Sequence, residues 1–212
     1  MILATEPPAD CTRCPRLAAF RQAQRAAHPD WFNSPVPSFG SRAAGLLIVG
    51  LAPGLRGANR TGRPFTGDYA GDLLYATLLK FGLAVGHYAA DPADGLVLTG
   101  ARIANAVRCV PPENKPEPAE IKACRPFLIA EWDTLPNLRV VLALGQVAHA
   151  QVLAARGLRQ AAYKFAHGAQ HTLPGDVTLA DSYHCSRYNT NTGRLTTAMF
   201  EAAVVALLPL LR

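Results

Sequence analysis

The sequence predicts an α/β fold in which a mostly parallel β-sheet is covered by helices on both faces. Apolar runs of strand length alternate along the chain with longer segments of helical periodicity, which is the pattern of such sheets. The runs "GLLIVGL" and "RVVLALG" are apolar throughout, as strands buried on both faces are. The 212 residues show no internal repeat and no linker, so we expect a single domain over residues 1–212.

The first half of the chain supplies two helices and two strands. Residues 14–27 carry apolar side chains on one side, which predicts a helix, and the short apolar run 45–51 predicts a buried strand. Residues 71–83 repeat leucine and phenylalanine at helical spacing and have a glycine near their end, where helices stop. Residues 101–109 predict a strand that runs into a proline-rich loop.

The second half continues the alternation. Residues 118–135 predict a helix, the apolar run 139–145 a strand, and 146–157 another helix. Residues 177–184 predict the last strand, and 193–211 predict a closing helix. The four predicted strands are each followed by a helical segment, which favours parallel pairing.

Three stretches of unusual composition follow predicted strands, at 50–68, 105–116 and 183–193. Because ligands of such sheets bind outside the carboxyl ends of the strands, we expect these stretches to meet in one crevice. The first, "GLAPGLRGANRTGRPFTGD", holds five glycines and three arginines. It has no lysine for a P-loop and no G-x-G-x-x-G, which argues against a nucleotide-phosphate cradle.

The charge balance favours a polyanionic partner. Lysine and arginine total 21 against 15 acidic residues, a net charge of +6 with a pI near 9.3. This favours nucleic acid first among partners. No apolar run is long enough to cross a bilayer, and the start of the chain has no pattern of a signal peptide. We therefore expect a cytoplasmic protein with no membrane partner.

The cysteines indicate a metal centre. Cys11 and Cys14 form a C-x2-C pair, and fourteen residues separate Cys109 from Cys124. In a cytosolic protein such spacing indicates metal binding rather than disulfides. Zinc sites usually repeat the short pair, so the split second pair favours a structural [4Fe-4S] cluster that ties the N-terminal helix to the middle of the chain. The alternative is that these are buried free cysteines.

Two long stretches resemble a known family. "GLAPGLRGANRTGRPFTGD" (50–68) and "HCSRYNTNTGRLT" (184–196), together with "NAVRCVPPENK" (105–115) and the four cysteines, resemble the uracil-DNA glycosylase superfamily. The match is to family 5, the type-B enzymes with an iron–sulfur cluster, over nearly the whole chain. It implies a three-layer sandwich with a central four-stranded, mostly parallel sheet, and a monomer. The implied activity is excision of uracil and other deaminated or damaged bases, such as hypoxanthine, xanthine or ethenocytosine, from DNA, which starts base excision repair.

The resemblance also implies roles for three side chains. Family 4 and family 5 members read the base with an asparagine, stack it on an aromatic ring and support the leaving group with a histidine. The matching positions are Asn105, Phe65 and His184. This chemistry needs a pocket for an extruded base and a donor for the charge that develops on it. The plainer alternatives are a loop cap, a core phenylalanine and a strand-end histidine.

No carboxylate stands at the start of the first motif. Related glycosylases carry an Asp, Glu or Asn there, whereas this chain has Leu51 and Ala52, which cannot orient water. Asp68 is the nearest carboxylate, and we expect it to hold water or to stabilise the cationic sugar. Its alternative role is the N-cap of the following helix. We expect Gly50, with the backbone of Leu51 and Ala52, to approach the flipped nucleotide closely.

The stretch "CSRYNTNTGR" is expected to enter a DNA groove as a wedge, with Tyr188 or Arg187 filling the gap left by the base. Further residues are expected to contact DNA, chiefly its phosphates: Asn189, Asn191, Arg60, Arg63 and Arg194. For each single arginine, the alternative is a solvated surface charge.

The chain departs from the family pattern at two positions. Cys185 stands where many members have proline, and Arg56 where many have histidine. Family 4 is the nearby alternative, disfavoured because its first motif carries a glutamate at the position of Leu51. A non-catalytic iron–sulfur nucleic-acid-binding module is the alternative from another class. Binding alone would not require Asn105, Phe65 and His184 in one crevice, which favours the enzyme.

Overall fold

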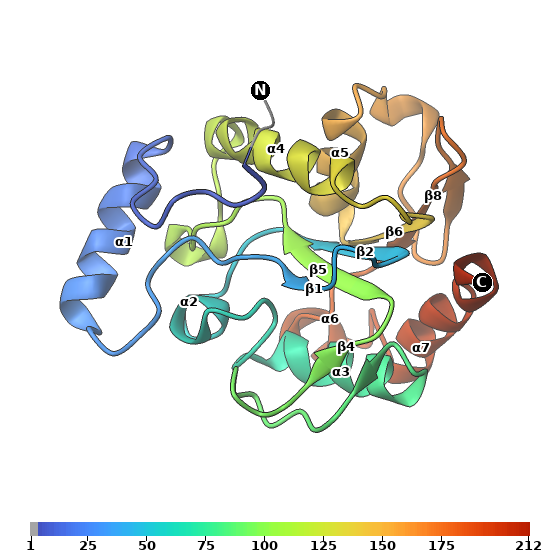
Figure 1. Cartoon of the computed structure of the whole chain (residues 1–212), viewed down its shortest axis with the longest axis horizontal. Helices are drawn as coiled ribbons and strands as arrows, with labels where there is room; N and C mark the ends of the chain where they lie inside the picture. The colour runs from blue at the N-terminus through green and yellow to red at the C-terminus, as the bar shows by residue number, and fades with distance from the viewer. Residues whose placement is uncertain (1–3) are drawn as a thin grey trace.

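The computed structural model describes residues 4–212, and it confirms the α/β class. Figure 1 shows a central sheet between two layers of helices, with α4 and α5 on one face and α3 and α7 on the other. Six strands form the sheet, in the spatial order β1 (Phe39–Gly40), β5 (Ala101–Asn105), β2 (Leu46–Gly50), β6 (Val140–Leu144), β8 (Thr178–Ser182) and β7 (Gln170–Thr172).

The four inner strands are parallel, as predicted, and two short antiparallel strands extend the sheet at its edges. The sequence prediction missed these edges because "FG" and "QHT" are too short to show a period. A separate two-stranded ribbon pairs β3 (Ala84–Val85) with β4 (Val97–Leu98).

The main helices are α1 (Pro15–Ala27), α3 (Tyr69–Lys80), α4 (Pro118–Asp133), α5 (Gln146–Ala155) and α7 (Thr197–Val205). Shorter turns of helix are α2 (Ala58–Thr61), α6 (Arg187–Asn191) and the 3-10 turns η1 (Pro112–Asn114), η2 (Gln160–Ala162) and η3 (Leu208–Leu211).

The closing helix is shorter than the prediction of 193–211. It begins after Thr196, whose side chain accepts a hydrogen bond from the Met199 N–H at 3.2 Å, and it ends at Val205. Pro209 explains the end, because a proline ring clashes with the carbonyl four residues before it in an α-helix. The chain then makes the 3-10 turn instead.

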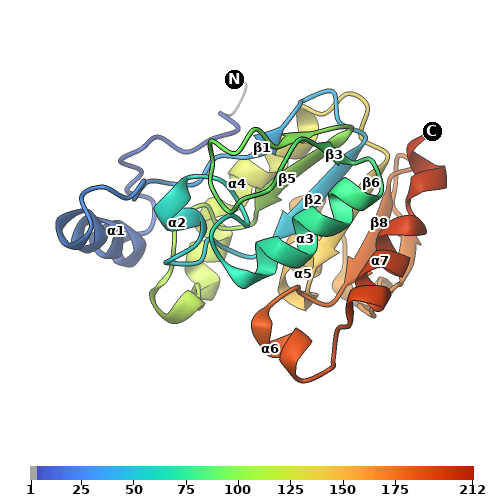
Figure 2. The same ribbon diagram turned by 90° about the horizontal axis from the view of Figure 1, so that it is seen from below.

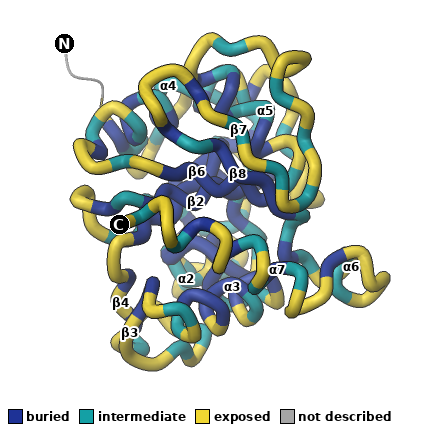
Figure 3. Tube along the Cα trace, turned by 90° about the vertical axis from the view of Figure 1, so that its right-hand side faces the viewer, coloured by how far each residue is buried: buried dark blue, intermediate teal, exposed yellow. Residues whose placement is uncertain are grey.

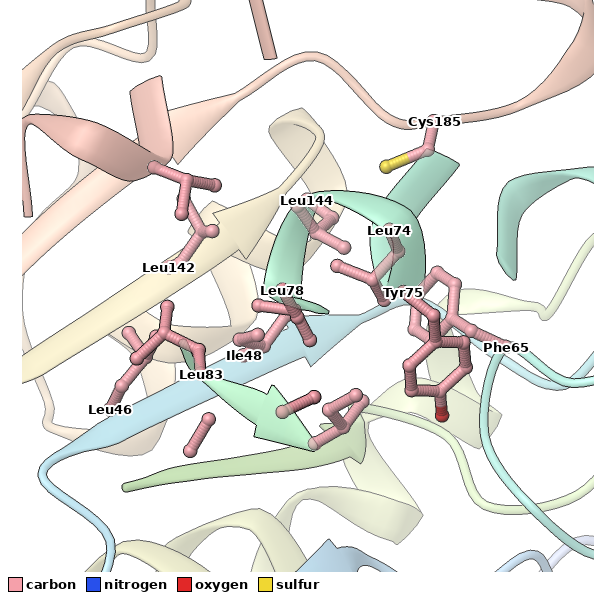
Figure 4. Close-up of a cluster of buried hydrophobic side chains, with 14 of the residues drawn as sticks. Leu46, Ile48, Phe65, Leu74, Tyr75, Leu78, Leu83, Leu142, Leu144 and Cys185 are labelled. Carbon is pink, nitrogen blue, oxygen red and sulfur yellow. The ribbon is translucent and has the colours of Figure 1, made fainter. Parts of the chain in front are cut away.

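Alternate residues of the inner strands pack into two separate cores, as the period of a strand requires. Leu46, Ile48 and Leu142 face α3, where they meet Leu74 and Leu78, and Figure 4 shows this cluster. The intervening residues face α4 and α5, in a second cluster that includes Leu47, Val49, Val141, Leu128 and Val152. Figure 3 shows the inner strands buried throughout, whereas α6 projects from the body and is largely exposed.

The register positions the candidate site. Gly50 at the end of β2 pairs with Asn105 at the end of β5, so both lie at the carboxyl edge of the sheet. Within residues 4–212, no helix combines the length and the apolar composition needed to cross a membrane.

Candidate active site

Three side chains that lie far apart in the sequence meet at the carboxyl edge of the sheet. A Cβ atom placed on Gly50 would lie 2.4 Å from Asn105 Oδ1 and 2.7 Å from Cζ of Phe65. The ring centroids of Phe65 and His184 are 5.8 Å apart, with the rings tilted by 31°. The structure therefore brings Asn105 and Phe65 together at Gly50, with His184 beside the Phe65 ring, as the sequence predicted.

Asn105 is buried, with an exposed fraction of 3%. Its Oδ1 atom accepts no hydrogen bond from any residue that the structure describes. A buried acceptor without a partner loses its hydration without compensation. The atom thus lies ready to accept a hydrogen bond from a ligand that enters the crevice.

Phe65 is held in an unusual backbone conformation. Its φ of +53° lies in the left-handed region, which residues other than glycine rarely adopt. Two tyrosine hydroxyls support it: Tyr88 donates to the carbonyl of Phe65 at 3.2 Å, and Tyr75 donates to the carbonyl of Pro64 at 2.6 Å. Strain of this kind persists only where the surroundings fix it, and it clusters at functional sites.

Arg63 corrects the sequence-based prediction of a phosphate contact. Its side chain is buried and forms two hydrogen bonds with Asp94, at 2.8 and 2.7 Å, and one with Thr66 at 2.7 Å. The guanidinium also lies 5.4 Å from the ring centroid of Tyr75. Arg63 therefore belongs to the scaffold beneath Phe65 and is not available to DNA.

His184 lies just beyond β8. The side-chain amide of Asn189 donates to its carbonyl oxygen at 2.9 Å, so Asn189 fixes the backbone at this histidine. Burial lowers the pKa of His184 to about 4. The imidazole is therefore neutral near pH 7 and carries one N–H donor.

Asp68 caps α3, as its alternative role predicted. Its Oδ1 accepts from the Gly71 N–H at 3.3 Å. A Cβ on Gly57 would lie only 2.3 Å from the other carboxylate oxygen, so the glycine makes room for it. Burial raises the pKa of Asp68, against the opposing backbone hydrogen bonds from Gly71 and Ala70. Capping leaves Oδ2 for another role.

Leu51 and Ala52 contribute mainly through their backbone. The carbonyl of Leu51 accepts from the Val107 N–H at 2.9 Å, which joins the loop to the chain beyond β5. The side chain of Ala52 packs against a hydrophobic cluster that contains Cys109 and Cys124. The loop after β2 thus links the crevice to the cysteines.

The predicted wedge is the α6 segment, which Figure 2 shows projecting from the body of the protein. Tyr188 is 72% exposed, and the guanidinium of Arg187 lies 5.4 Å from the ring centroid of Tyr69. Arg194 lies 4.6 Å from the ring centroid of Tyr183, next to His184. Two further predicted contacts, Arg60 and Asn191, also remain at the surface.

The four predicted metal ligands line one cavity. Cys11 and Cys14 reach it from the start of α1, Cys109 from the loop after β5, and Cys124 from α4. Arg21 donates to the sulfur of Cys109 at 3.4 Å. Burial raises the pKa of Cys14 to about 11 and that of Cys109 to about 12. Within residues 4–212, no three His, Cys, Asp or Glu side chains gather closely enough to hold a single metal ion.

Sequence reasoning missed the residues that support the crevice. Asp94 and Tyr88 lie in an irregular segment before β4, and Gln146 and Phe165 line a groove beside His184. No local pattern marks these positions. An arginine needs a carboxylate partner only where it is buried, and the tertiary structure decides which arginine of the loop is buried.

Comparison with known proteins places the chain in a family. The model of the "Uracil DNA glycosylase superfamily" matches residues 37–208. A type-5 uracil-DNA glycosylase of Thermus thermophilus is 48% identical over 90% of this chain and 89% of its own length. In Pyrobaculum aerophilum, a type-5 enzyme is 39% identical over 88% of this chain and 83% of its own length. A type-4 enzyme of the same organism is 32% identical over 71% of this chain and 63% of its own length. The chain therefore belongs to the uracil DNA glycosylase superfamily.

Proposed function

We propose that this protein is a monofunctional DNA glycosylase that draws uracil out of DNA and hydrolyses its N-glycosidic bond, which starts base excision repair. The observation that carries the proposal is the unpaired, buried Oδ1 of Asn105 beside Phe65 and Gly50. The relatives from Thermus thermophilus and Pyrobaculum aerophilum are type-5 uracil-DNA glycosylases, which supports the same activity. Enzymes that act on a base flip it out of the stack and read its Watson–Crick edge.

Recognition follows from the chemistry of the amide. The Oδ1 of Asn105 can accept from the ring N–H of uracil, and the amide nitrogen can donate to a neighbouring carbonyl. The ring of Phe65 offers a face on which the base can stack. We expect the base to approach the backbone of Gly50, against which Asn105 Oδ1 and the Phe65 ring pack.

We propose that His184 stabilises the leaving group by donating a hydrogen bond to the departing base. Negative charge builds on the base as the glycosidic bond breaks, and a fixed donor at that point lowers the barrier. A neutral imidazole donates to the developing charge without first losing a proton to the base. The depressed pKa of His184 keeps the ring in that state.

We propose that Asp68 holds the attacking water or stabilises the cationic sugar. Leu51 and Ala52 offer no side chain that orients water. A Cβ on Gly54 or Gly57 would lie 2.9 or 2.3 Å from Asp68 Oδ2, so this carboxylate oxygen borders the loop that follows β2.

The same crevice is proposed to accept other deaminated or damaged bases, namely hypoxanthine, xanthine and ethenocytosine. The support is the first motif, which lacks a carboxylate that would restrict the pocket to one base. The α6 wedge and the exposed Arg60, Arg187, Asn191 and Arg194 are proposed to hold the DNA. By the resemblance to family 5, we propose that a monomer is active.

A [4Fe-4S] cluster is proposed at Cys11, Cys14, Cys109 and Cys124. The four sulfurs border one cavity, and in such clusters each thiolate binds a different iron, so the sulfurs need not converge on a point. When bound, the cluster would supply a cross-link between α1, the loop after β5 and α4. Loading must release thiol protons, because burial raises the pKa of Cys109.

The cofactor proposal is tested by iron and sulfide analysis and the visible absorption of anaerobically purified protein. We expect four irons and four sulfides per chain. Replacing Cys124 with serine should remove the absorption, whereas replacing Cys185 with serine should leave it. A colourless wild-type protein with bound zinc would overturn the cluster assignment.

The activity is tested with labelled duplexes that contain uracil, hypoxanthine, xanthine, ethenocytosine or no lesion, followed by alkaline cleavage of abasic sites. We expect cleavage in the uracil strand and none in the intact duplex. A shifted duplex without abasic product would overturn the enzyme and leave a non-catalytic binding module. Cleavage restricted to uracil would support the glycosylase and overturn the broader pocket.

A further inference from the structure

Behind one wall of the crevice, a buried histidine and aspartate form a pair that base excision does not use. His149 lies in α5 and Asp181 in β8, and both are fully buried. The Nδ1 atom of His149 lies 2.7 Å from Asp181 Oδ1, and its Nε2 atom lies 2.9 Å from the carbonyl oxygen of Tyr163. His171 approaches from β7, with Nε2 3.8 Å from the other oxygen of Asp181.

The partners of His149 dictate its protonation. A carbonyl oxygen only accepts, so Nε2 must carry a hydrogen, and an ionised carboxylate demands the same of Nδ1. The ring is then an imidazolium. Burial alone would lower the pKa of His149, but the hydrogen bond and charge of Asp181, with the carbonyl of Tyr163, outweigh burial and raise it.

The pair anchors an irregular segment, residues 163–169, that has no helix or strand of its own. Two of its residues, Phe165 and Ala166, line a groove together with His184. In the same segment, Nδ1 of His167 accepts from the Tyr183 N–H at 3.3 Å.

Two backbone hydrogen bonds tie the end of the segment to β8: the Gly168 N–H donates to the Asp181 carbonyl at 2.8 Å, and the Asp181 N–H donates to the Ala169 carbonyl at 2.9 Å. Toward Phe165, the groove wall depends on the side-chain hydrogen bonds of His149 and His167.

The groove has the composition of a nucleic-acid contact. Gln146, Asn189 and Arg194 line it beside Phe165, and it opens next to His184. Amide and guanidinium groups bind phosphates, and aromatic rings bind bases. A strand whose flipped nucleotide occupies the crevice would continue along this groove.

We propose that His149 is a positioning residue: its imidazolium, held between Asp181 and the Tyr163 carbonyl, fixes the 163–169 wall of the groove that takes the DNA strand beside the flipped nucleotide. The inference rests on the proposed excision of bases from DNA.

Few other ionisable groups face this proton. The segment 163–169 contributes Tyr163, and β8 contributes Asp181. The strand β7 contributes His171, whose ring centroid lies 6.0 Å from that of His149. From α4, Arg125 bonds to Gln151 and Asp133 pairs with Arg156, both away from His149. The strands β2 and β6 contribute no ionisable side chain.

The test compares His149→Gln with the wild type in single-turnover excision of uracil over a range of duplex concentrations and pH. Glutamine keeps a donor but cannot become a cation. We expect the half-saturating duplex concentration to rise roughly tenfold, the cost of one charge-assisted hydrogen bond, with the maximal rate unchanged. His87→Gln, at an exposed position, is the matched control.

The pH dependence separates positioning from a general structural role. In the wild type the half-saturating concentration should rise as the pH climbs through the raised pKa of His149, whereas in His149→Gln it should be high and flat. A loss of maximal rate with unchanged half-saturation would overturn the proposal. So would a wild-type profile that His149→Gln leaves unaltered.

Two measurements do not depend on excision. Nuclear magnetic resonance of the wild type should detect both ring N–H protons of His149, and hydrogen exchange in His149→Gln should quicken selectively at 163–172. If the single variant does not fold, the pair His149→Gln with Asp181→Asn removes both charges and takes its place. A neutral His149 ring, or exchange that quickens evenly over the chain, would overturn the inference even if the wild type proves active.

Absence of excision by the wild type would refute the proposed function, while the resonance and exchange measurements would still decide the role of the His149–Asp181 pair.

Discussion

Gly50 shows how much a single missing side chain contributes to the crevice. Because glycine has no Cβ, Asn105 Oδ1 and the Phe65 ring can pack against the Gly50 backbone. The same backbone pairs with β5 in the sheet. Asn105 and Phe65 therefore occupy positions that any larger residue at the end of β2 would disturb.

Replacing Gly50 with alanine should displace both side chains and lower the rate of uracil excision on the order of a hundredfold, the cost of misplacing a binding group by about 1 Å. The rate is measured in single turnover. Gly45→Ala is the control, because a Cβ there would meet its nearest neighbours at an ordinary 3.5 Å. Equal rates for the two variants would contradict the role of Gly50.

Asp68 combines a structural and a proposed chemical role, which two substitutions separate. Asparagine caps helices as well as aspartate does, so Asp68→Asn should leave the free energy of unfolding nearly unchanged and lower excision about a hundredfold. Asp68→Ala should lose about 1 kcal/mol of stability in addition. Urea denaturation and single-turnover rates check both. Full activity in Asp68→Asn would leave the residue as a cap alone.

The depressed pKa of His184 predicts an unusual pH dependence. Because the ring stays neutral down to about pH 4, the excision rate should show no inflection from this residue near the ordinary histidine pKa of about 6.5. As the pH falls from about 6.5 toward about 4, the unfolded chain binds a proton that the native state does not, so the free energy of unfolding should decline in that window. An inflection near pH 6.5 in the wild type that His184→Gln abolishes would contradict this assignment.

At the scale of elements, the loop between β2 and α3 is held by an interior ion pair rather than by regular structure. The exposed fractions of the Arg63 and Asp94 side chains are 5% and 1%. The hydrogen bonds from Arg63 hold the pKa of Asp94 far below its usual range, against the effect of burial. The pair therefore contributes stability at every pH above the ordinary carboxyl range and loses it only in strong acid.

Replacing Asp94 with alanine should lower the free energy of unfolding by about 3–5 kcal/mol, because it leaves the buried charge of Arg63 unpaired. It should also release Phe65 and slow excision. The control is Asp133→Ala, which breaks an ion pair whose side chains are 36% and 54% exposed and should cost about 1 kcal/mol or less. Similar losses in both variants, measured by urea denaturation, would refute the scaffold role of Asp94.

At the scale of the whole molecule, the net charge of +6 predicts binding that weakens with salt. Each phosphate that an arginine neutralises contributes roughly −0.9 to the slope of the logarithm of affinity against that of salt concentration. Arg194→Gln, beside His184, should reduce the slope by about one. Arg139→Gln, at the opposite end of the sheet where β6 begins, should not. Fluorescence anisotropy with an intact duplex measures both, and equal slopes would remove Arg194 from the interface.

The sequence by itself determined the α/β class and the four inner strands, and its resemblance to family 5 indicated Asn105, Phe65 and His184 for the crevice. Buried strands need continuous apolar runs and helices need a 3.6-residue period, so both can be recognised in the amino-acid sequence. The carboxyl ends of parallel strands meet at one edge, which is why stretches far apart in the chain could be joined in prediction. The edge strands, of two and three residues, and the α6 turn are too short to show such a pattern.

The tertiary structure alone decided the partners of each charge. "R63" and "R60" look alike in a glycine-rich loop, yet Arg63 points inward to Asp94 and Arg60 stays at the surface. Likewise, nothing local distinguishes His149, whose two ring nitrogens find a carboxylate and a carbonyl, from the other histidines. The physical reason is that a buried charge is stable only beside a partner, and the partner comes from another part of the chain.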